Sequence, residues 1–67
     1  MITIKINGEF KEVKESTNIR DLVDEAGLLD TRYAVEVNEE IVPRSKHPSY
    51  QFKNNDIVEI VTAVGGG

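Results

Sequence analysis

Residues 2–8 read ITIKING, and this stretch decides the fold because it opens a β-hairpin. Its isoleucines alternate with polar residues, which is the pattern of a half-buried strand. Asn7 and Gly8 both tolerate positive φ angles, so the pair predicts a type I′ hairpin turn. In the return strand, residues 9–14, Phe10 and Val13 break strict alternation and favour an edge position or a bulge. Two strands alone are marginally stable, so the hairpin needs a further layer to pack against.

The next pattern is a short amphipathic helix over residues 19–26, which supplies that layer. Asn18 is the expected N-cap, and Asp21 completes a variant of the capping box. Gly27 suits the first position after the helix, where positive φ is common. The apolar residues of this segment recur at the spacing of one helical face and are Ile19, Leu22, Val23 and Ala26.

The rest of the chain predicts strands at residues 33–37, 41–42 and 57–62, with a turn at residues 38–40. Pro43 follows the second of these strands and places it at a sheet edge, because proline cannot donate to a neighbouring strand. Tyr50 and Phe52 are the expected anchors of the irregular segment that follows. This order predicts an α+β fold of the β-grasp type, a four- to five-stranded mixed sheet with one main helix across one face. The first and last strands are the most apolar and should lie parallel at its centre.

A chain of 67 residues forms one small domain, and its charge narrows the classes of partner. The net charge of −4 disfavours nucleic acids and anionic membranes and favours a partner with a basic docking surface. The absence of cysteine excludes disulfides, and the single histidine, His47, argues against zinc and is interpreted as an exposed loop residue. There is no apolar run of about 18 residues and no signal-peptide pattern, so we expect a cytoplasmic protein without a membrane helix.

The sequence ends in three consecutive glycines, Gly65, Gly66 and Gly67. We expect residues 1–62 to form the domain and residues 63–67 to form a flexible glycine tail. Five extended residues span roughly 15–18 Å, enough to carry the Gly67 carboxylate into the active site of another protein. Gly65 and Gly66 have no side chains and would thread a narrow slot there. The alternative is an ordinary frayed terminus.

A free carboxylate is a poor electrophile, so the tail becomes an acyl donor only after another enzyme activates it. Adenylation with ATP and Mg²⁺ achieves this, and the enzyme must be a partner because this chain has no P-loop. The chain also has no cysteine nucleophile and no catalytic triad pattern. It is therefore interpreted as a carrier or co-substrate rather than an enzyme, with no cofactor or metal bound to the chain itself.

A possible docking face lies on the last strand. Val58 and Ile60 should point into the core, which leaves Ile57, Glu59 and Val61 on the face away from the helix. Exposed apolar groups of this kind mark interaction sites, although scattered apolar residues are also ordinary surface. The residues expected beside this face are Ala34 and Thr3. Arg44 is interpreted as a solvated charge beyond an edge strand, with a contact to an acidic partner groove as the alternative.

These segments resemble the ThiS-type sulfur carriers of thiamine (thiazole) biosynthesis, in the ubiquitin-like β-grasp superfamily. The resemblance covers the whole chain, and its most specific parts are the NEEIVPR stretch at residues 38–44 and the glycine end. It implies that an E1-like adenylyltransferase activates the Gly67 carboxylate with ATP. Sulfur from a cysteine persulfide, made by a cysteine desulfurase, then replaces AMP to give a thiocarboxylate. Thiazole synthase, a (β/α)₈ barrel, receives the tail and takes the sulfur.

The sequence also fits other classes of protein. The small subunit of molybdopterin synthase and other β-grasp sulfur carriers share the glycine end. A ubiquitin-like protein modifier would form isopeptide bonds through the same carboxylate. A regulatory β-grasp binding module would use no terminal chemistry at all.

Overall fold

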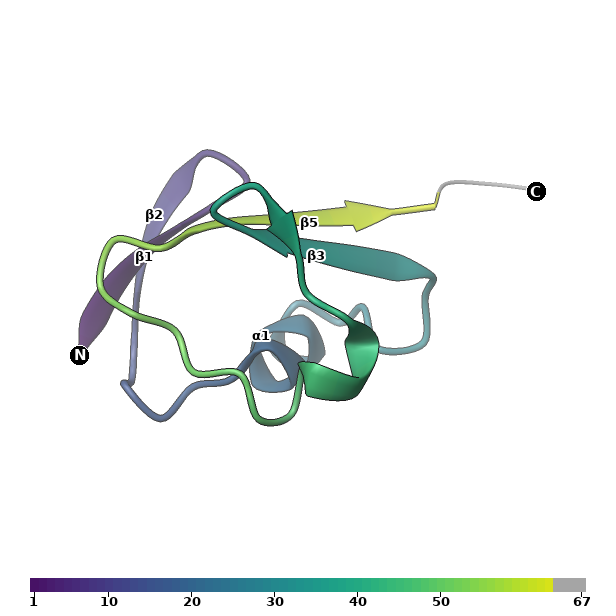
Figure 1. The fold of residues 1–67 in the computed structure, drawn as a ribbon, viewed down its shortest axis with the longest axis horizontal. Helices are drawn as coiled ribbons and strands as arrows, with labels where there is room; N and C mark the ends of the chain where they lie inside the picture. Colours follow the sequence, from purple (N-terminus) through teal and green to yellow (C-terminus); the bar gives the residue numbers. More distant parts are fainter. Residues whose placement is uncertain (64–67) are drawn as a thin grey trace.

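The computed structural model describes residues 1–63, which form one five-stranded mixed sheet with a helix packed on one face (Figure 1). The strand order across the sheet is β2-β1-β5-β3-β4. As predicted, the first and last strands are central neighbours and run parallel, while the other pairs are antiparallel. The elements in chain order are β1 (Ile2–Ile6), β2 (Glu9–Val13), α1 (Ile19–Glu25), β3 (Tyr33–Val37), β4 (Glu40–Ile41), the 3₁₀-helix η1 (Arg44–Lys46) and β5 (Ile57–Thr62).

Both hairpins close through two-residue turns. Asn7 and Gly8 have φ angles of 47° and 87°, so the predicted type I′ turn is confirmed. β2 is an edge strand, and its pairing with β1 is regular, so the bulge is not needed. Asn38 and Glu39 also have positive φ angles, of 52° and 69°. The expected three-residue turn at 38–40 is therefore wrong, and β4 begins at Glu40, one residue before the predicted start.

The predicted capping box at the start of α1 is present. The Asn18 side-chain oxygen accepts a hydrogen bond from the Asp21 amide at 2.7 Å, and the Asp21 carboxylate accepts one from the Asn18 amide at 3.4 Å. The helix ends at Glu25, with Ala26 as its C-cap and Gly27 at a φ of 74°. Ala26 is exposed, so the apolar face stops one turn earlier than predicted. Within residues 1–63, α1 is the longest helix, and none is long and apolar enough to cross a membrane.

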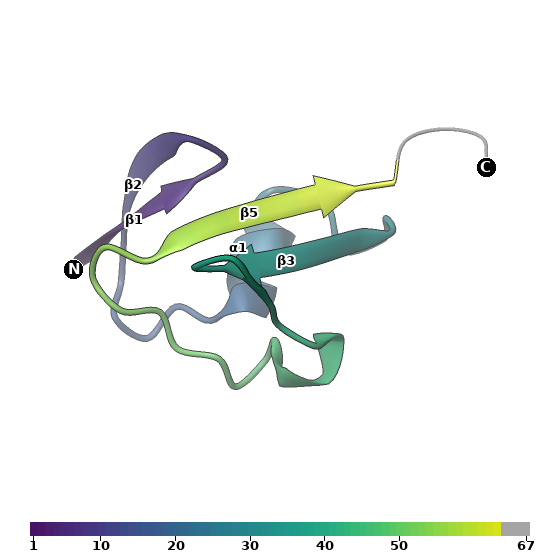
Figure 2. The same cartoon turned by 45° about the horizontal axis from the view of Figure 1, so that its top comes forward.

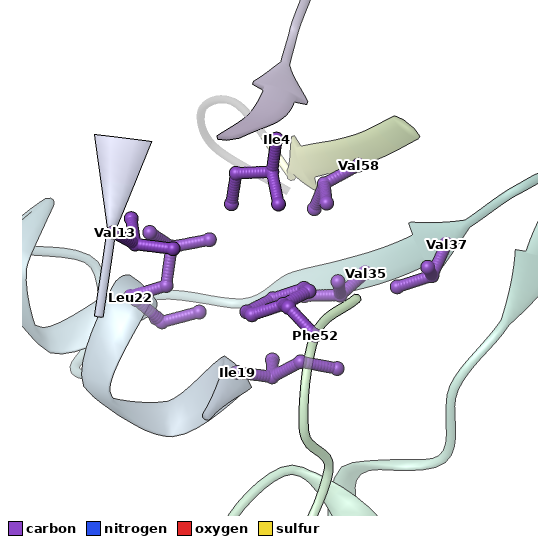
Figure 3. Packing of buried hydrophobic residues seen from close by; sticks show 9 residues of the cluster. Ile4, Val13, Ile19, Leu22, Val35, Val37, Phe52 and Val58 are labelled. Atoms are coloured by element: carbon purple, nitrogen blue, oxygen red, sulfur yellow. The ribbon is translucent and has the colours of Figure 1, made fainter. Parts of the chain in front are cut away.

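The core lies between α1 and the sheet. Figure 3 shows Phe52, from the loop before β5, among the side chains of the sheet and of α1. Tyr50 packs edge-on against Phe52, with ring centroids 5.6 Å apart, so both predicted anchors are confirmed. Burial, together with the charges of Asp56 and Glu40, raises the pKa of the Tyr50 phenol, which keeps it neutral. The buried apolar residues are Ile4, Val13, Ile19, Leu22, Val23, Val35, Val37, Phe52 and Val58.

Two asparagine side chains hold β5 in place. Asn38 accepts a hydrogen bond from the Ile57 amide and donates to the buried Asp56 carboxylate, each at 3.0 Å. Asn7 accepts from the Ile60 amide at 2.9 Å and donates to the Ile60 carbonyl at 3.3 Å. The Asn38 contacts fix the start of β5, and the Asn7 contacts extend the association of β1 with β5 beyond the end of β1 as far as Ile60.

Candidate functional site

β5 carries the chain past the end of β1 toward the C-terminus. The β1–β5 pairing ends at Ile6 and Val58, whereas the pairing with β3 continues to Tyr33 and Thr62. Figure 2 shows β5 lying between β1 and β3 and extending beyond the end of β1. The Ala63 amide donates to the Arg32 carbonyl at 2.9 Å, which fixes the last described residue against the loop before β3. A rigid strand thus leads directly to the position where the expected tail begins.

The glycines on which the sequence prediction rests lie outside the described residues. This applies to Gly67, the expected site of covalent modification, and to Gly65 and Gly66, the expected threading residues. Their roles, and the boundary at residue 63, stay predictions. The described residues next to them still constrain where an enzyme that takes the tail must bind.

The face of the sheet opposite α1 carries the expected docking residues. Ile57 and Val61 are each 53% exposed, and Glu59 is exposed between them. Ala34 lies directly opposite Val61 on β3, as expected. Thr3 does not lie beside this face of β5, because it pairs with the Asn54–Asn55 turn, and Lys5 is the β1 residue next to Ile57. The predicted exposure is confirmed, and docking on this face stays a prediction.

Two further large apolar residues lie on this face and were not expected there. Phe10 is directly opposite Lys5, whose ammonium lies 5.4 Å from the ring centroid, and Ile41 is directly opposite Glu36. Directly opposed residues share one face of a sheet, so both side chains join Ile57 and Val61. This placement could have been predicted by extending the alternation of inward and outward side chains from β1 to β2 and from β3 to β4. We call this surface the open sheet face. It consists of Phe10, Ala34, Glu36, Ile41, Ile57, Glu59 and Val61.

The open sheet face has an acidic centre. Glu36 on β3 lies directly opposite Glu59 on β5. Like charges directly opposed across two strands destabilise a sheet, and no described basic side chain forms a salt bridge with either carboxylate. A cationic group on a binding partner would relieve this repulsion. The face therefore suits a partner surface that is apolar with a basic centre, and such a partner stays a prediction.

The ring of Tyr33, at the start of β3, contacts the Arg44 guanidinium and the His47 ring. The Arg44 guanidinium lies 4.2 Å from the Tyr33 ring centroid and donates to the Thr31 carbonyl at 3.4 Å. The His47 ring lies 5.8 Å from Tyr33 at an interplanar angle of 28°. Arg44 is exposed, but it is held in place, so the interpretation as a simply solvated charge is incomplete.

The interpretation of His47 as an exposed loop residue is wrong. Its side chain is buried, with 3% of its surface exposed, because η1 turns the chain back under Tyr33. Nε2 of His47 lies 2.9 Å from the Val42 carbonyl oxygen. A carbonyl oxygen can only accept, so Nε2 carries the proton and donates. Nδ1 is buried and has no hydrogen-bond partner among residues 1–63.

One hollow lies at the end of β5, and a second adjoins it beside the loop before β3. A shallow one of about 320 Å³ is lined by the loop before β3, by β3 and by the last residues of β5, including Val61 and Ala63. A larger one of about 530 Å³ lies beside the Tyr33 stack and is lined by Arg20, Arg32 and Arg44 among others. Arg32 and Tyr33 line both hollows, so the larger cavity adjoins the point where the chain leaves the sheet. No group of three or more potential metal ligands occurs within residues 1–63.

Comparison with known proteins gives a consistent set of similarities. The model of the ThiS family matches residues 4–67. The chain is 39% identical over 62 residues to a thiazole synthase of Paramagnetospirillum magneticum, covering 92% of this chain but only 19% of that protein. It is 32% identical over 65 residues to the sulfur carrier protein ThiS of Bacillus subtilis, covering 96% of this chain and 98% of that protein. The crystal structure of the thiamine biosynthesis protein ThiS from Geobacter metallireducens superposes with a TM-score of 0.79 at 28% identity, covering 98% and 100% of the two chains.

Proposed function

The chain belongs to the ThiS family of sulfur carriers in thiamine biosynthesis, and from this membership we propose that the Gly67 carboxylate is the group that carries the sulfur. The observation that carries this proposal is the position of β5. A central strand between β1 and β3 leads to Ala63, which lies at one end of the sheet. A carrier needs this arrangement, because its reactive end must reach a partner's active site while its body remains folded.

The proposed chemistry takes place in the active sites of partner enzymes. In the first step, an oxygen of the Gly67 carboxylate attacks the α-phosphorus of ATP in an E1-like adenylyltransferase that uses Mg²⁺, and pyrophosphate leaves. In the second, the terminal sulfur of a cysteine persulfide, made by a cysteine desulfurase, attacks the acyl carbon, and AMP leaves. A thiol then attacks the cysteine sulfur of this acyl disulfide, which forms a new disulfide with that cysteine and releases the thiocarboxylate. Its sulfur is a nucleophile that the unmodified, cysteine-free chain lacks.

Thiazole synthase is the proposed acceptor of the sulfur. The match to the Paramagnetospirillum thiazole synthase spans 92% of this chain and 19% of that protein, so a domain similar to this one occurs within a synthase polypeptide. Joining a carrier to the enzyme that consumes its cargo raises their effective concentration. The chain's own part is that of carrier and co-substrate: it presents the tail and is recognised by the enzymes that load and unload it.

The test of this proposal is the intact mass of the protein after incubation with the adenylyltransferase, ATP, a cysteine desulfurase and cysteine. Replacement of one oxygen by one sulfur at Gly67 is expected to add about 16 Da, from the atomic masses. Omission of ATP is the control and should leave the mass unchanged. Conjugates of higher mass with lysine side chains, or no gain of mass with ATP present, would contradict the proposal and favour a protein modifier or a binding module.

We propose that the open sheet face docks on the adenylyltransferase. Val61 lies two residues before Ala63, so an enzyme that binds the tail in its active site must also meet this end of β5. The acidic pair Glu36–Glu59 would meet a basic group of the enzyme, and the apolar residues around it would be desolvated. Such a mixed surface gives both affinity and orientation.

The Val61→Asp variant is expected to weaken binding to the adenylyltransferase by about tenfold or more, because a charge would be buried in an apolar contact. Val61 is half exposed in the free protein, so the fold should be kept. Calorimetric titration measures the affinity, and thermal unfolding checks the fold. Ser16→Asp, in the exposed loop between β2 and α1, adds the same charge away from this face and should bind normally. Equal affinities for the two variants would dismiss the open sheet face as the docking site.

A further inference from the structure

The cavity beside the Tyr33 stack concentrates positive charge on an otherwise acidic protein. Arg20 from α1, Arg32 from the loop before β3 and Arg44 from η1 all line it, with a single carboxylate, that of Asp30. Within residues 1–63, the one ion pair joins Lys11 to Glu25, on a different part of the surface. The three guanidiniums therefore have no carboxylate of the described chain within salt-bridge distance, although the net charge of the protein is −4.

Two contacts within the protein position the Arg44 guanidinium before any ligand binds. The guanidinium carbon lies 4.2 Å from the Tyr33 ring centroid, and one of the guanidinium nitrogens donates to the Thr31 carbonyl at 3.4 Å, so both contacts restrict its position. A guanidinium has five N–H donors in a rigid fork, so most of them remain available. An arginine that is oriented before binding loses less side-chain entropy when it forms a bidentate pair with a carboxylate.

The walls of the cavity are built from segments far apart in the sequence. The Arg20 amide donates to the His47 carbonyl at 3.3 Å, which ties the first turn of α1 to the end of η1. His47 in turn donates to the Val42 carbonyl and stacks on Tyr33, while its buried Nδ1 has no partner within residues 1–63. These contacts join the segments that form the cavity, and the His47 Nδ1 beside it lacks the hydrogen bond that most buried polar atoms make.

We propose that this cavity receives an aspartate or glutamate side chain of thiazole synthase and so orients the carrier when it delivers its sulfur. The inference rests on the proposed function and adds a second recognition surface to it. Arg32 and Tyr33 line both this cavity and the hollow at Ala63, so the arginines lie near the end of β5 without belonging to the open sheet face. The adenylyltransferase is assigned to the open sheet face, which leaves the cavity for thiazole synthase. The open sheet face is acidic at its centre and the cavity is basic. Opposite charges call for different partner surfaces, which lets the loading and unloading enzymes use separate sites.

The experiment measures binding and loading on the same set of full-length variants. Arg44→Glu and Arg32→Glu reverse a charge in the cavity, and Lys14→Glu makes the same change at the end of β2, outside the cavity. Calorimetry gives the affinity for thiazole synthase, and intact mass gives thiocarboxylate loading by the adenylyltransferase and sulfur source. We expect both cavity variants to bind the synthase at least about tenfold more weakly than the wild type, with Lys14→Glu within about twofold. All three should gain the sulfur normally.

Salt provides an independent readout. Raising the ionic strength from about 0.1 M to about 1 M shortens the Debye length from about 10 Å to about 3 Å. The difference in affinity for thiazole synthase between Arg32→Glu and the wild type should therefore shrink. The Arg32 side chain is exposed, so this variant stays informative if Arg44→Glu, which loses the Tyr33 stack, proves unstable in thermal unfolding.

The outcomes separate this inference from the proposed function. Wild-type protein that loads sulfur, together with cavity variants that bind the synthase as the wild type does, overturns the cavity inference and leaves the carrier function standing. Cavity variants that fail at loading as well as at synthase binding would assign the cavity to the adenylyltransferase and also overturn it. Wild-type protein that never gains sulfur overturns the proposed function, and the inference with it.

Discussion

The Gly66→Ala variant is expected to keep its fold and to lose adenylation of Gly67 completely. In the proposed mechanism, the tail passes through a slot one backbone wide, where an added methyl group blocks the approach of the carboxylate to ATP. Position 66 comes after the end of β5 at Thr62, so the free energy of unfolding should stay within about 0.5 kcal/mol of the wild type. Pyrophosphate release with the adenylyltransferase measures adenylation, and urea unfolding measures the free energy of unfolding.

Gly27→Ala is the matched control, because it adds the same methyl group after α1 rather than in the tail. Gly27 has a φ angle of 74°, and no atom lies within 4 Å of an added Cβ, so strain rather than a clash sets the effect. A left-handed alanine costs about 1–2 kcal/mol, so this variant should be less stable yet adenylated normally. The two glycines thus separate folding from chemistry. Normal pyrophosphate release by Gly66→Ala would refute the slot.

The Ile4→Ala variant should lose about 2–5 kcal/mol of stability, the usual cost of such a truncation in a core. Ile4 is fully buried, with 0% of its surface exposed, and lies on a central strand against α1. Small domains have free energies of unfolding near the lower end of about 5–15 kcal/mol, so this loss would unfold a substantial fraction of the variant. Urea unfolding followed by far-ultraviolet circular dichroism measures the change.

Ile41→Ala removes the same atoms from an exposed site. Ile41 is 71% exposed on the edge strand β4, so its loss should cost less than about 1 kcal/mol, mainly through strand propensity. The contrast between the two isoleucines tests the assignment of the two faces of the sheet. Similar losses for both variants would be incompatible with a core between α1 and the inner face.

The features that could be predicted from the sequence are those set by short-range patterns. The Asn7–Gly8 turn depends on two adjacent residues, and the cap of α1 depends on Asn18 and Asp21, three residues apart. The central parallel pairing of β1 with β5 could be predicted because these are the two most apolar strands and central strands bury the most surface. The exposure of Ile57, Glu59 and Val61 then followed from simple alternation along β5.

The features that were missed depend on contacts between distant segments. Lys46 and Pro48 flank His47 and indicate an exposed loop, but the ring is buried by Tyr33 and Val42, which local composition does not reveal. Glu39 adopts a positive φ that glutamate rarely favours, so the sequence predicts a three-residue turn before β4 where the structure has a two-residue turn. The arginines of the cavity come from three separate segments, and each by itself reads as an ordinary surface charge.

The parallel pairing of β1 with β5 has a practical consequence for handling the molecule. Because the two strands run in the same direction, β1 starts at the end of the sheet opposite to the one where β5 finishes (Figure 1). An affinity handle, a fluorophore or a surface tether joined ahead of Met1 therefore leaves from the side remote from Ala63. Immobilised through that side, the protein presents Ala63 to the solution, so surface-based assays of binding to either proposed enzyme can use it.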